Sequence, residues 1–132
     1  MKIIPFTSIG LLKFGDSRQD ARGKFASRFS TFAKFSEENP IDLVADDAIH
    51  LHYSDAGLLE FVEAFDPAEV TFQDIAFLGR DLEAVISDMM SIGFSPTRSD
   101  VGVEFEGAGI ALYAPSGVVE AVAAHREGYD DE

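Results

Sequence analysis

Two histidines separated by a single residue are the side chains in this sequence best placed to do chemistry. His50 and His52 lie in a stretch that predicts a β-strand, so both imidazoles point to the same face of that strand. Imidazole and carboxylate groups are common metal ligands, and Asp55 or Glu60 could complete a metal site. The same pair could instead pack within the fold or lie in an interface, which is the interpretation we favour.

The other signatures of catalysis are missing from the sequence. Cysteine is absent from the 132 residues, which excludes thiol nucleophiles, disulfides and cysteine-ligated zinc. No serine lies in a Gly-x-Ser-x-Gly turn, and no glycine-rich loop has the spacing that binds phosphates. Adjacent carboxylates such as Asp46 and Asp47 carry little information in a chain with 24 acidic residues. We therefore expect a protein that is not an enzyme and that uses no metal or cofactor.

The strongest compositional signal is negative charge. Ten lysines and arginines face 24 aspartates and glutamates, which gives a formal net charge of −14 and a pI near 4.4. Residues 1–34 hold seven bases and two acids, a net charge of +5, whereas residues 35–132 hold three bases and 22 acids, a net charge of −19. Nucleic acids and anionic membrane surfaces would repel such a chain, so neither is an expected partner. A protein with a basic surface is the favoured partner.

The length and the 46% hydrophobic content indicate a single domain over residues 1–132. The start of the chain lacks the apolar stretch of about 7–15 residues that a signal peptide needs. No segment approaches the roughly 20 apolar residues of a membrane helix. We expect a cytoplasmic protein.

Two weak internal matches indicate a duplicated unit. Residues 14–18 match residues 78–82, and residues 53–62 match residues 113–122, where Tyr, Gly, Glu and Val recur in register. The matches predict one repeat unit at about residues 9–66, a second at about 67–126, and an acidic tail at 127–132. In this alignment Ile110 and Leu112 are the counterparts of His50 and His52, which supports a packing or interface role for the histidines.

Each unit is predicted to be a helix followed by antiparallel strands. In the first unit Ser17 begins a capping box, and Phe25 to Phe35 continue the helix or form its end and then a strand. Strands at 48–53 and 58–64 flank a predicted turn at 54–57. In the second unit Asp81 caps a helix that ends near Gly93, and strands follow at 101–106, 109–113 and 118–124.

One apolar stripe marks the second helix, at Leu82, Val85, Ile86, Met89 and Met90. The fold class expected is α+β, with tandem helix-plus-antiparallel-hairpin repeats that share one antiparallel sheet and pack their helices on one of its faces.

Six short segments together resemble a known class of proteins. They are residues 13–18, 49–55, 59–63, 77–80, 109–113 and 128–129. This pattern resembles small bacterial immunity proteins of polymorphic or contact-dependent growth-inhibition toxin systems. The resemblance implies a protein that binds and neutralises a cognate toxin in the cytoplasm. The helix-then-hairpin duplication is also similar to that of tandem-repeat protein inhibitors of enzymes.

The leading hypothesis is an immunity protein that blocks the active or substrate-binding surface of a toxin, most plausibly a basic nuclease. The residues expected to contact the partner share charge or a polar ring in predicted turns and strands. They are Asp46, Asp47, His50, His52, Tyr53, Asp55, Glu104, Glu106 and Tyr113. Two alternatives stay open. One is a scaffold or regulatory homodimer that pairs through a sheet edge, and the other is a metal-dependent enzyme that uses His50 and His52.

Overall fold

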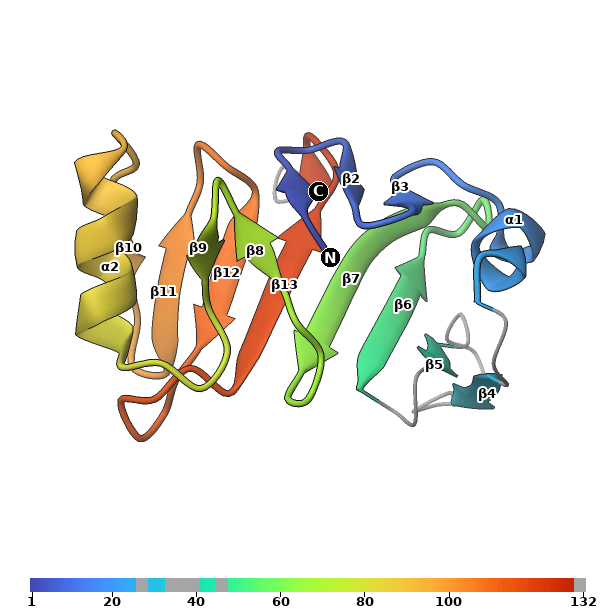
Figure 1. The fold of residues 1–132 in the computed structure, drawn as a ribbon. Helices are drawn as coiled ribbons and strands as arrows, with labels where there is room; N and C mark the ends of the chain where they lie inside the picture. Colours follow the sequence, from blue (N-terminus) through green and yellow to red (C-terminus); the bar gives the residue numbers. More distant parts are fainter. Residues whose placement is uncertain (26–28, 33–40, 45–47, 130–132) are drawn as a thin grey trace.

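One eight-stranded antiparallel sheet organises the molecule, and the fold is α+β as predicted (Figure 1). The computed structural model describes residues 1–25, 29–32, 41–44 and 48–129. The strand order is β10-β11-β12-β13-β7-β6-β5-β4. The bounds are β4 Phe29–Phe32, β5 Ile41–Val44, β6 Ile49–Tyr53, β7 Leu59–Phe65, β10 Thr97–Arg98, β11 Gly102–Phe105, β12 Ile110–Tyr113 and β13 Ala121–His125.

Two helices and two small sheets in the described residues complete the fold. The helices are α1 (Arg18–Gly23) and α2 (Leu82–Ser91). The small sheets consist of β1 (Ile3–Ile4), β2 (Ser8–Ile9) and β3 (Leu12–Lys13), and of β8 (Thr71–Phe72) and β9 (Ile75–Ala76). No helix in the described part of the chain has the length and apolar character needed to cross a membrane.

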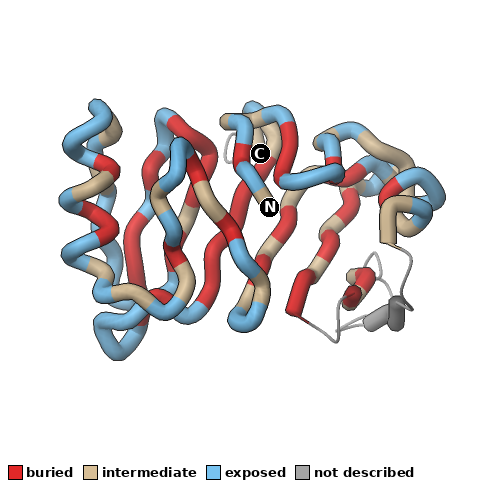
Figure 2. Tube along the Cα trace, viewed as in Figure 1, coloured by how far each residue is buried: buried red, intermediate tan, exposed pale blue. Residues whose placement is uncertain are grey.

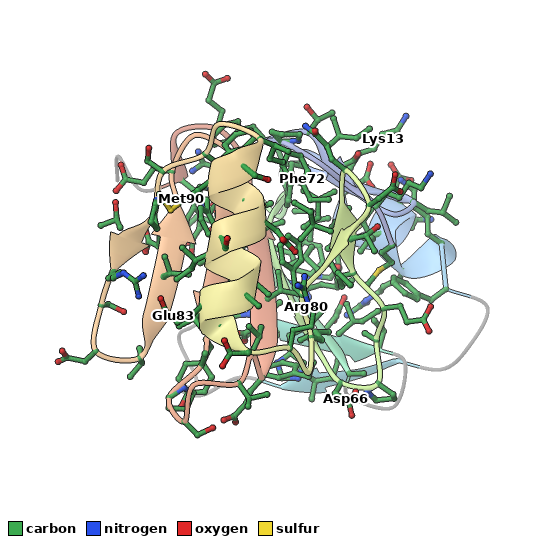
Figure 3. All side chains as sticks on the ribbon, turned by 60° about the vertical axis from the view of Figure 1, so that its left-hand side comes forward. Lys13, Asp66, Phe72, Arg80, Glu83 and Met90 are labelled. Atoms are coloured by element: carbon green, nitrogen blue, oxygen red, sulfur yellow. The ribbon has the colours of Figure 1, made fainter. Side chains whose placement is uncertain are left out.

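The large sheet has an inner face that is covered and an outer face that is not. Strand β6 shows the alternation, because Ile49, Leu51 and Tyr53 are buried on the inner face while His50 and His52 are partly exposed on the outer face. Both helices and both small sheets lie on the inner side, and side chains fill the space between α2 and the sheet (Figures 1 and 3). Figure 2 shows this alternation along β6, whereas every residue of β13 is buried. In the described part of the chain, no helix or second sheet packs on the outer face.

Local chemistry begins both helices where the sequence predicts. The Ser17 hydroxyl accepts a hydrogen bond from the Asp20 N–H at 3.1 Å, and the Asp81 carboxylate accepts one from the Ala84 N–H at 3.2 Å. Gly93 adopts the left-handed conformation expected after α2, with φ of 98°.

The structure corrects one expectation about the buried side of α2 and decides where α1 ends. Met90 was expected in the buried stripe of α2, but it is 57% exposed, because it lies about 100° around the helix from the buried Met89. Helix α1 ends at Gly23, and Phe29–Phe32 form β4, so the described part of the Phe25–Phe35 segment contains a strand. The remainder of that segment, residues 26–28 and 33–35, falls outside the described residues.

The loops that precede α1 and α2 form matching hydrogen bonds. The Gly15 N–H donates to the Leu59 carbonyl, and the Leu59 N–H donates back to the residue after Gly15. In the other half of the chain the Gly79 N–H donates to the Val119 carbonyl, and the Val119 N–H donates back to the residue after Gly79. Leu59 begins β7, and Val119 lies two residues before β13; these two strands lie side by side at the centre of the sheet.

The assignment of Ile110 and Leu112 as counterparts of the two histidines is wrong in the structure. Ile110 and Leu112 are buried on the inner face, whereas His50 and His52 face outward. A register shift between His52 and Tyr53 displaces β6 by one residue against β7, and a slip of one residue moves every side chain to the opposite face.

Candidate protein-binding face

The outer face of the large sheet brings together side chains from distant parts of the sequence. Strand register defines it, because residues paired across antiparallel strands lie on the same face. One paired row runs across seven strands in the order Thr97, Glu104, Ala111, Ala123, Glu63, His50 and Leu43. A second row places Tyr113, Ala121 and Phe65 side by side.

Aromatic rings on this face contact one another in a chain. His52 contacts Phe61 at a centroid distance of 4.9 Å, and Phe61 stacks with Tyr129 at 5.3 Å. Tyr129 also contacts His125 at 5.3 Å, and His125 contacts Phe6 at 6.0 Å. Such contacts fix rings in place, so the face presents a preformed aromatic surface. Preformed aromatic surfaces are typical of protein interfaces.

Short side chains separate this aromatic cluster from the opposite half of the face. Ala111, Ala121 and Ala123 lie on β12 and β13, between Tyr113 on one side and Glu63 on the other. Tyr113 is 44% exposed, which leaves its ring available to a partner. Ala121 and Ala123 are only 1% and 5% exposed, so the side chains around them form the accessible part of this region.

Most bases in the described residues are held by carboxylates of the same chain. Six of the eight lysines and arginines there form ion pairs: Arg18 and Arg22 with Asp42, Lys24 with Asp16, Arg80 with Asp88, Arg98 with Glu83, and Arg126 with Glu60. The positive N-terminal stretch is thus partly neutralised by acids from the negative part of the chain. The outer face keeps carboxylates at Glu104, Glu106 and Glu127 that form no ion pair within the described residues.

Asp42 is the centre of a buried charge cluster on the inner face. Its side chain is fully buried and accepts two hydrogen bonds from Arg22 at 2.8 Å, one from Arg18 at 3.2 Å and one from the Tyr53 hydroxyl at 2.9 Å. Burial raises the pKa of Asp42, but the hydrogen bonds from Arg22 and Tyr53 outweigh burial and hold this pKa below its ordinary value of 3.8. Burial and the bond to Asp42 raise the pKa of Tyr53. The cluster ties α1 to β5 and β6 and is structural.

The structure distributes the predicted contact residues unevenly. His50, His52, Glu104 and Tyr113 share the outer face, although they come from both halves of the chain. Glu106 is exposed in the β11–β12 turn, at one end of that face.

Two positions on the predicted list lie away from the outer face, and two others fall outside the described residues. Tyr53 points to the inner face, where it is 4% exposed and bonded to Asp42, so its side chain does not take part in an outer surface. Asp55 is exposed in the β6–β7 turn. Asp46 and Asp47 lie outside the described residues.

Sequence reasoning missed the aromatic residues Phe61 and Phe65. Their signal was present, because they alternate with Val62 and Ala64, although the predicted strand at 58–64 ended one residue before Phe65. Phe6 has no such signal, since its place beside His125 depends on how the N-terminal turn folds across the sheet end.

The described residues contain no group of three or more histidines, cysteines, aspartates or glutamates placed to hold a metal ion. Comparisons with protein-family models, with curated proteins and with solved structures found no match.

Proposed function

We propose that the protein is an immunity protein that binds and neutralises a cognate bacterial toxin in the cytoplasm, and that the outer face of its sheet is the binding surface. The observation that carries this proposal is the uncovered face itself, which combines a fixed aromatic cluster with carboxylates not neutralised within the described residues. Aromatic anchors bordered by polar groups are the usual composition of a protein-binding surface. The sequence resemblance supplies the toxin as the partner.

The dimensions of the face suit this role. Eight strands spaced by about 4.8 Å span roughly 34 Å, and a strand of five residues is about 16 Å long. The product, on the order of 500 Å², approaches the roughly 800 Å² that each partner contributes to an interface of standard size. Loops at both ends of the strands supply the remaining contact area.

The charge of the face favours a basic nuclease as the toxin. A nuclease presents cationic groups to the phosphates of its substrate. Carboxylates such as Glu104 and Glu106 would bind those groups and cover the surface on which the nucleic acid lies. Opposite charges also accelerate encounter, by roughly 10- to 1,000-fold at low salt.

We further propose that the chain is a duplication of one helix-plus-hairpin unit, with units at about residues 9–66 and 67–126. The matching loop hydrogen bonds before α1 and α2 support this, as does the strand order, in which β4 to β7 mirror β10 to β13. In that arrangement Glu63 and Ala123, which are 60 residues apart, pair with each other at the centre of the sheet. A pseudo-two-fold axis between them would relate the two units.

A growth assay tests the immunity function. The protein encoded beside this chain's gene is produced in a bacterial host, alone and together with this chain. We expect growth arrest by the neighbour alone and normal growth when both are produced. A toxic neighbour that this chain fails to neutralise would overturn the proposal.

Surface variants test the face. His50→Ala combined with Tyr113→Ala removes two outer-face side chains without opening the core, and should weaken toxin binding about 30-fold or more. Met90→Ala serves as the matched control, because Met90 is exposed on α2, on the inner side of the sheet. If the double variant still bound and neutralised the toxin with wild-type affinity, the outer face would be excluded as the binding surface. An association rate that is unchanged between about 50 and 500 mM salt would exclude charge steering.

A further inference from the structure

A pocket lies at the end of the outer face where the β11–β12 turn meets the C-terminal segment. Its volume is about 360 Å³, and it opens to solvent. It is lined by two aromatic rings, a histidine, three glutamates and a glycine: Phe6, Tyr129, His125, Glu104, Glu106, Glu127 and Gly128.

The aromatic walls of the pocket are fixed by packing. Tyr129 is held by its stacking on Phe61 and its contact with His125. Phe6 lies against Gly109, where a Cβ atom would come within 2.8 Å of the Phe6 ring. Only glycine leaves room for the ring at this position. The rings therefore form a preformed aromatic lining rather than loose surface side chains.

The three glutamates give the pocket a negative charge that no base in the described residues pairs with. Glu104, Glu106 and Glu127 are exposed and form no ion pair within the described residues. Arg126 is the nearest base in sequence, and it borders the pocket. Its guanidinium pairs with the Glu60 carboxylate at 3.4 Å and donates to the Glu127 carbonyl at 2.9 Å, so it forms no ion pair with the three glutamates. A cation that enters from outside would meet rings and carboxylates together.

The protein itself shows which cation suits such a combination. The Arg18 guanidinium lies 4.0 Å from the ring centroid of Tyr53 while it donates a hydrogen bond to Asp42. Arg126 repeats the pattern, at 5.9 Å from the Tyr129 centroid and paired with Glu60. A guanidinium is planar, stacks on rings and donates in a fork to carboxylates, whereas the lysine ammonium does neither as well.

We infer that this pocket is the anchor site for an arginine side chain of the basic partner. The inference rests on the proposed function, since it names the partner group that the outer face binds. An anchor at one end of the face would also help to fix the orientation of the partner on it.

A peptide titration tests the pocket without the partner. Acetyl-Gly-Arg-Gly-amide is added to the ¹⁵N-labelled full chain, and amide shifts are followed by NMR. We expect saturable shifts at Gly107 and Gly128, weaker binding of the lysine peptide, and no saturable binding of the citrulline peptide, which has the same shape but no charge. Equal binding of the citrulline peptide, or shifts spread evenly over the molecule, would overturn the inference.

Matched variants complete the test. Glu104→Gln with Glu106→Gln should weaken arginine-peptide binding about tenfold or more. The control, Asp74→Asn with Asp100→Asn, changes net charge equally at exposed sites outside the pocket, and should change affinity less than twofold. An unchanged amide spectrum away from the pocket shows that each variant is folded. If both double variants weakened arginine-peptide binding equally, net charge alone would explain the effect, and the inference would be overturned.

Failure of the pocket and failure of the proposed function give different results. Peptide binding that is saturable and lost in the glutamine variant, together with no toxin neutralisation, leaves the pocket and removes the function. Neutralisation with no arginine-peptide binding leaves the function and removes the pocket.

Discussion

Replacement of Asp42 by asparagine tests whether a buried carboxylate holds the first helix on the sheet. The substitution keeps the size of the side chain but removes the charge that Arg18 and Arg22 contact. One acceptor oxygen also becomes a donor that faces a guanidinium or the Tyr53 hydroxyl. Breaking a buried ion pair by removal of one partner costs about 3–5 kcal/mol. A domain of this size is stable by about 5–15 kcal/mol, so the loss is a large fraction of the total.

Urea unfolding followed by circular dichroism measures this cost, and two other variants calibrate it. Tyr53→Phe removes one hydrogen bond to the charge and should cost about 1.5–3 kcal/mol, which keeps the test readable if the asparagine variant does not fold. Asp88→Asn breaks the exposed ion pair to Arg80 and should cost less than about 1 kcal/mol. An Asp42→Asn cost no greater than that of Asp88→Asn would refute the reasoning.

The same cluster sets a pH dependence with a definite sign. The folded pKa of Asp42 lies below its ordinary value of 3.8, so the unfolded chain takes up the proton at higher pH than the folded chain. The stabilisation is complete above about pH 4 and falls as the pH drops through the folded pKa. The stability difference between the wild-type chain and Asp42→Asn should therefore shrink below about pH 4, which unfolding curves at several acidic pH values measure. A difference that grows on acidification would contradict this sign.

Three further predictions concern local structure. Gly109→Ala should cost more than the roughly 1–2 kcal/mol expected for Gly57→Ala, because both glycines have positive φ but only Gly109 lacks space for a Cβ atom; urea midpoints compare the two. By the same measurement, Met89→Ala should lower the free energy of unfolding by about 2–5 kcal/mol and Met90→Ala by less than about 0.5 kcal/mol. Similar losses in the two variants would contradict the burial of Met89 and the exposure of Met90. Asp81→Ala should lower the free energy of unfolding by about 1 kcal/mol, because the α2 cap is lost. An unchanged stability in thermal unfolding would show that the cap does not stabilise the protein.

Sequence reasoning succeeded where a few neighbouring residues decide the structure. The caps at Ser17 and Asp81 and the left-handed turn at Gly93 depend on local hydrogen bonds, and all are present as predicted. It missed the small sheets, because strands of two residues carry no measurable periodicity, and it also missed β5. The expectation that Tyr53 faces a partner was wrong because β6 alternates regularly, so the residue next to the outward His52 points to the inner face.

The candidate face was predictable only in part, because it depends on pairing between strands that are distant in the sequence. The spacing of His50 and His52 predicts that both side chains lie on the same face of a strand. Glu104 and Tyr113 were expected at a surface because of their charge and residue type. Their presence on one face depends on the central pairing of β7 with β13, which joins segments about 60 residues apart. No local sequence pattern predicts that pairing. The contact of Phe6 with His125 depends instead on how the N-terminal turn folds.

The internal pairing of six bases has a consequence for copies of the molecule in solution. Since six of the eight lysines and arginines in the described residues pair with carboxylates of the same chain, the excess negative charge lies on the remaining carboxylates. Two copies that approach outer face to outer face would bring Glu63, Glu104 and Glu106 of each near those of the other, and like charges repel. This repulsion opposes the pairing of two copies through their outer faces.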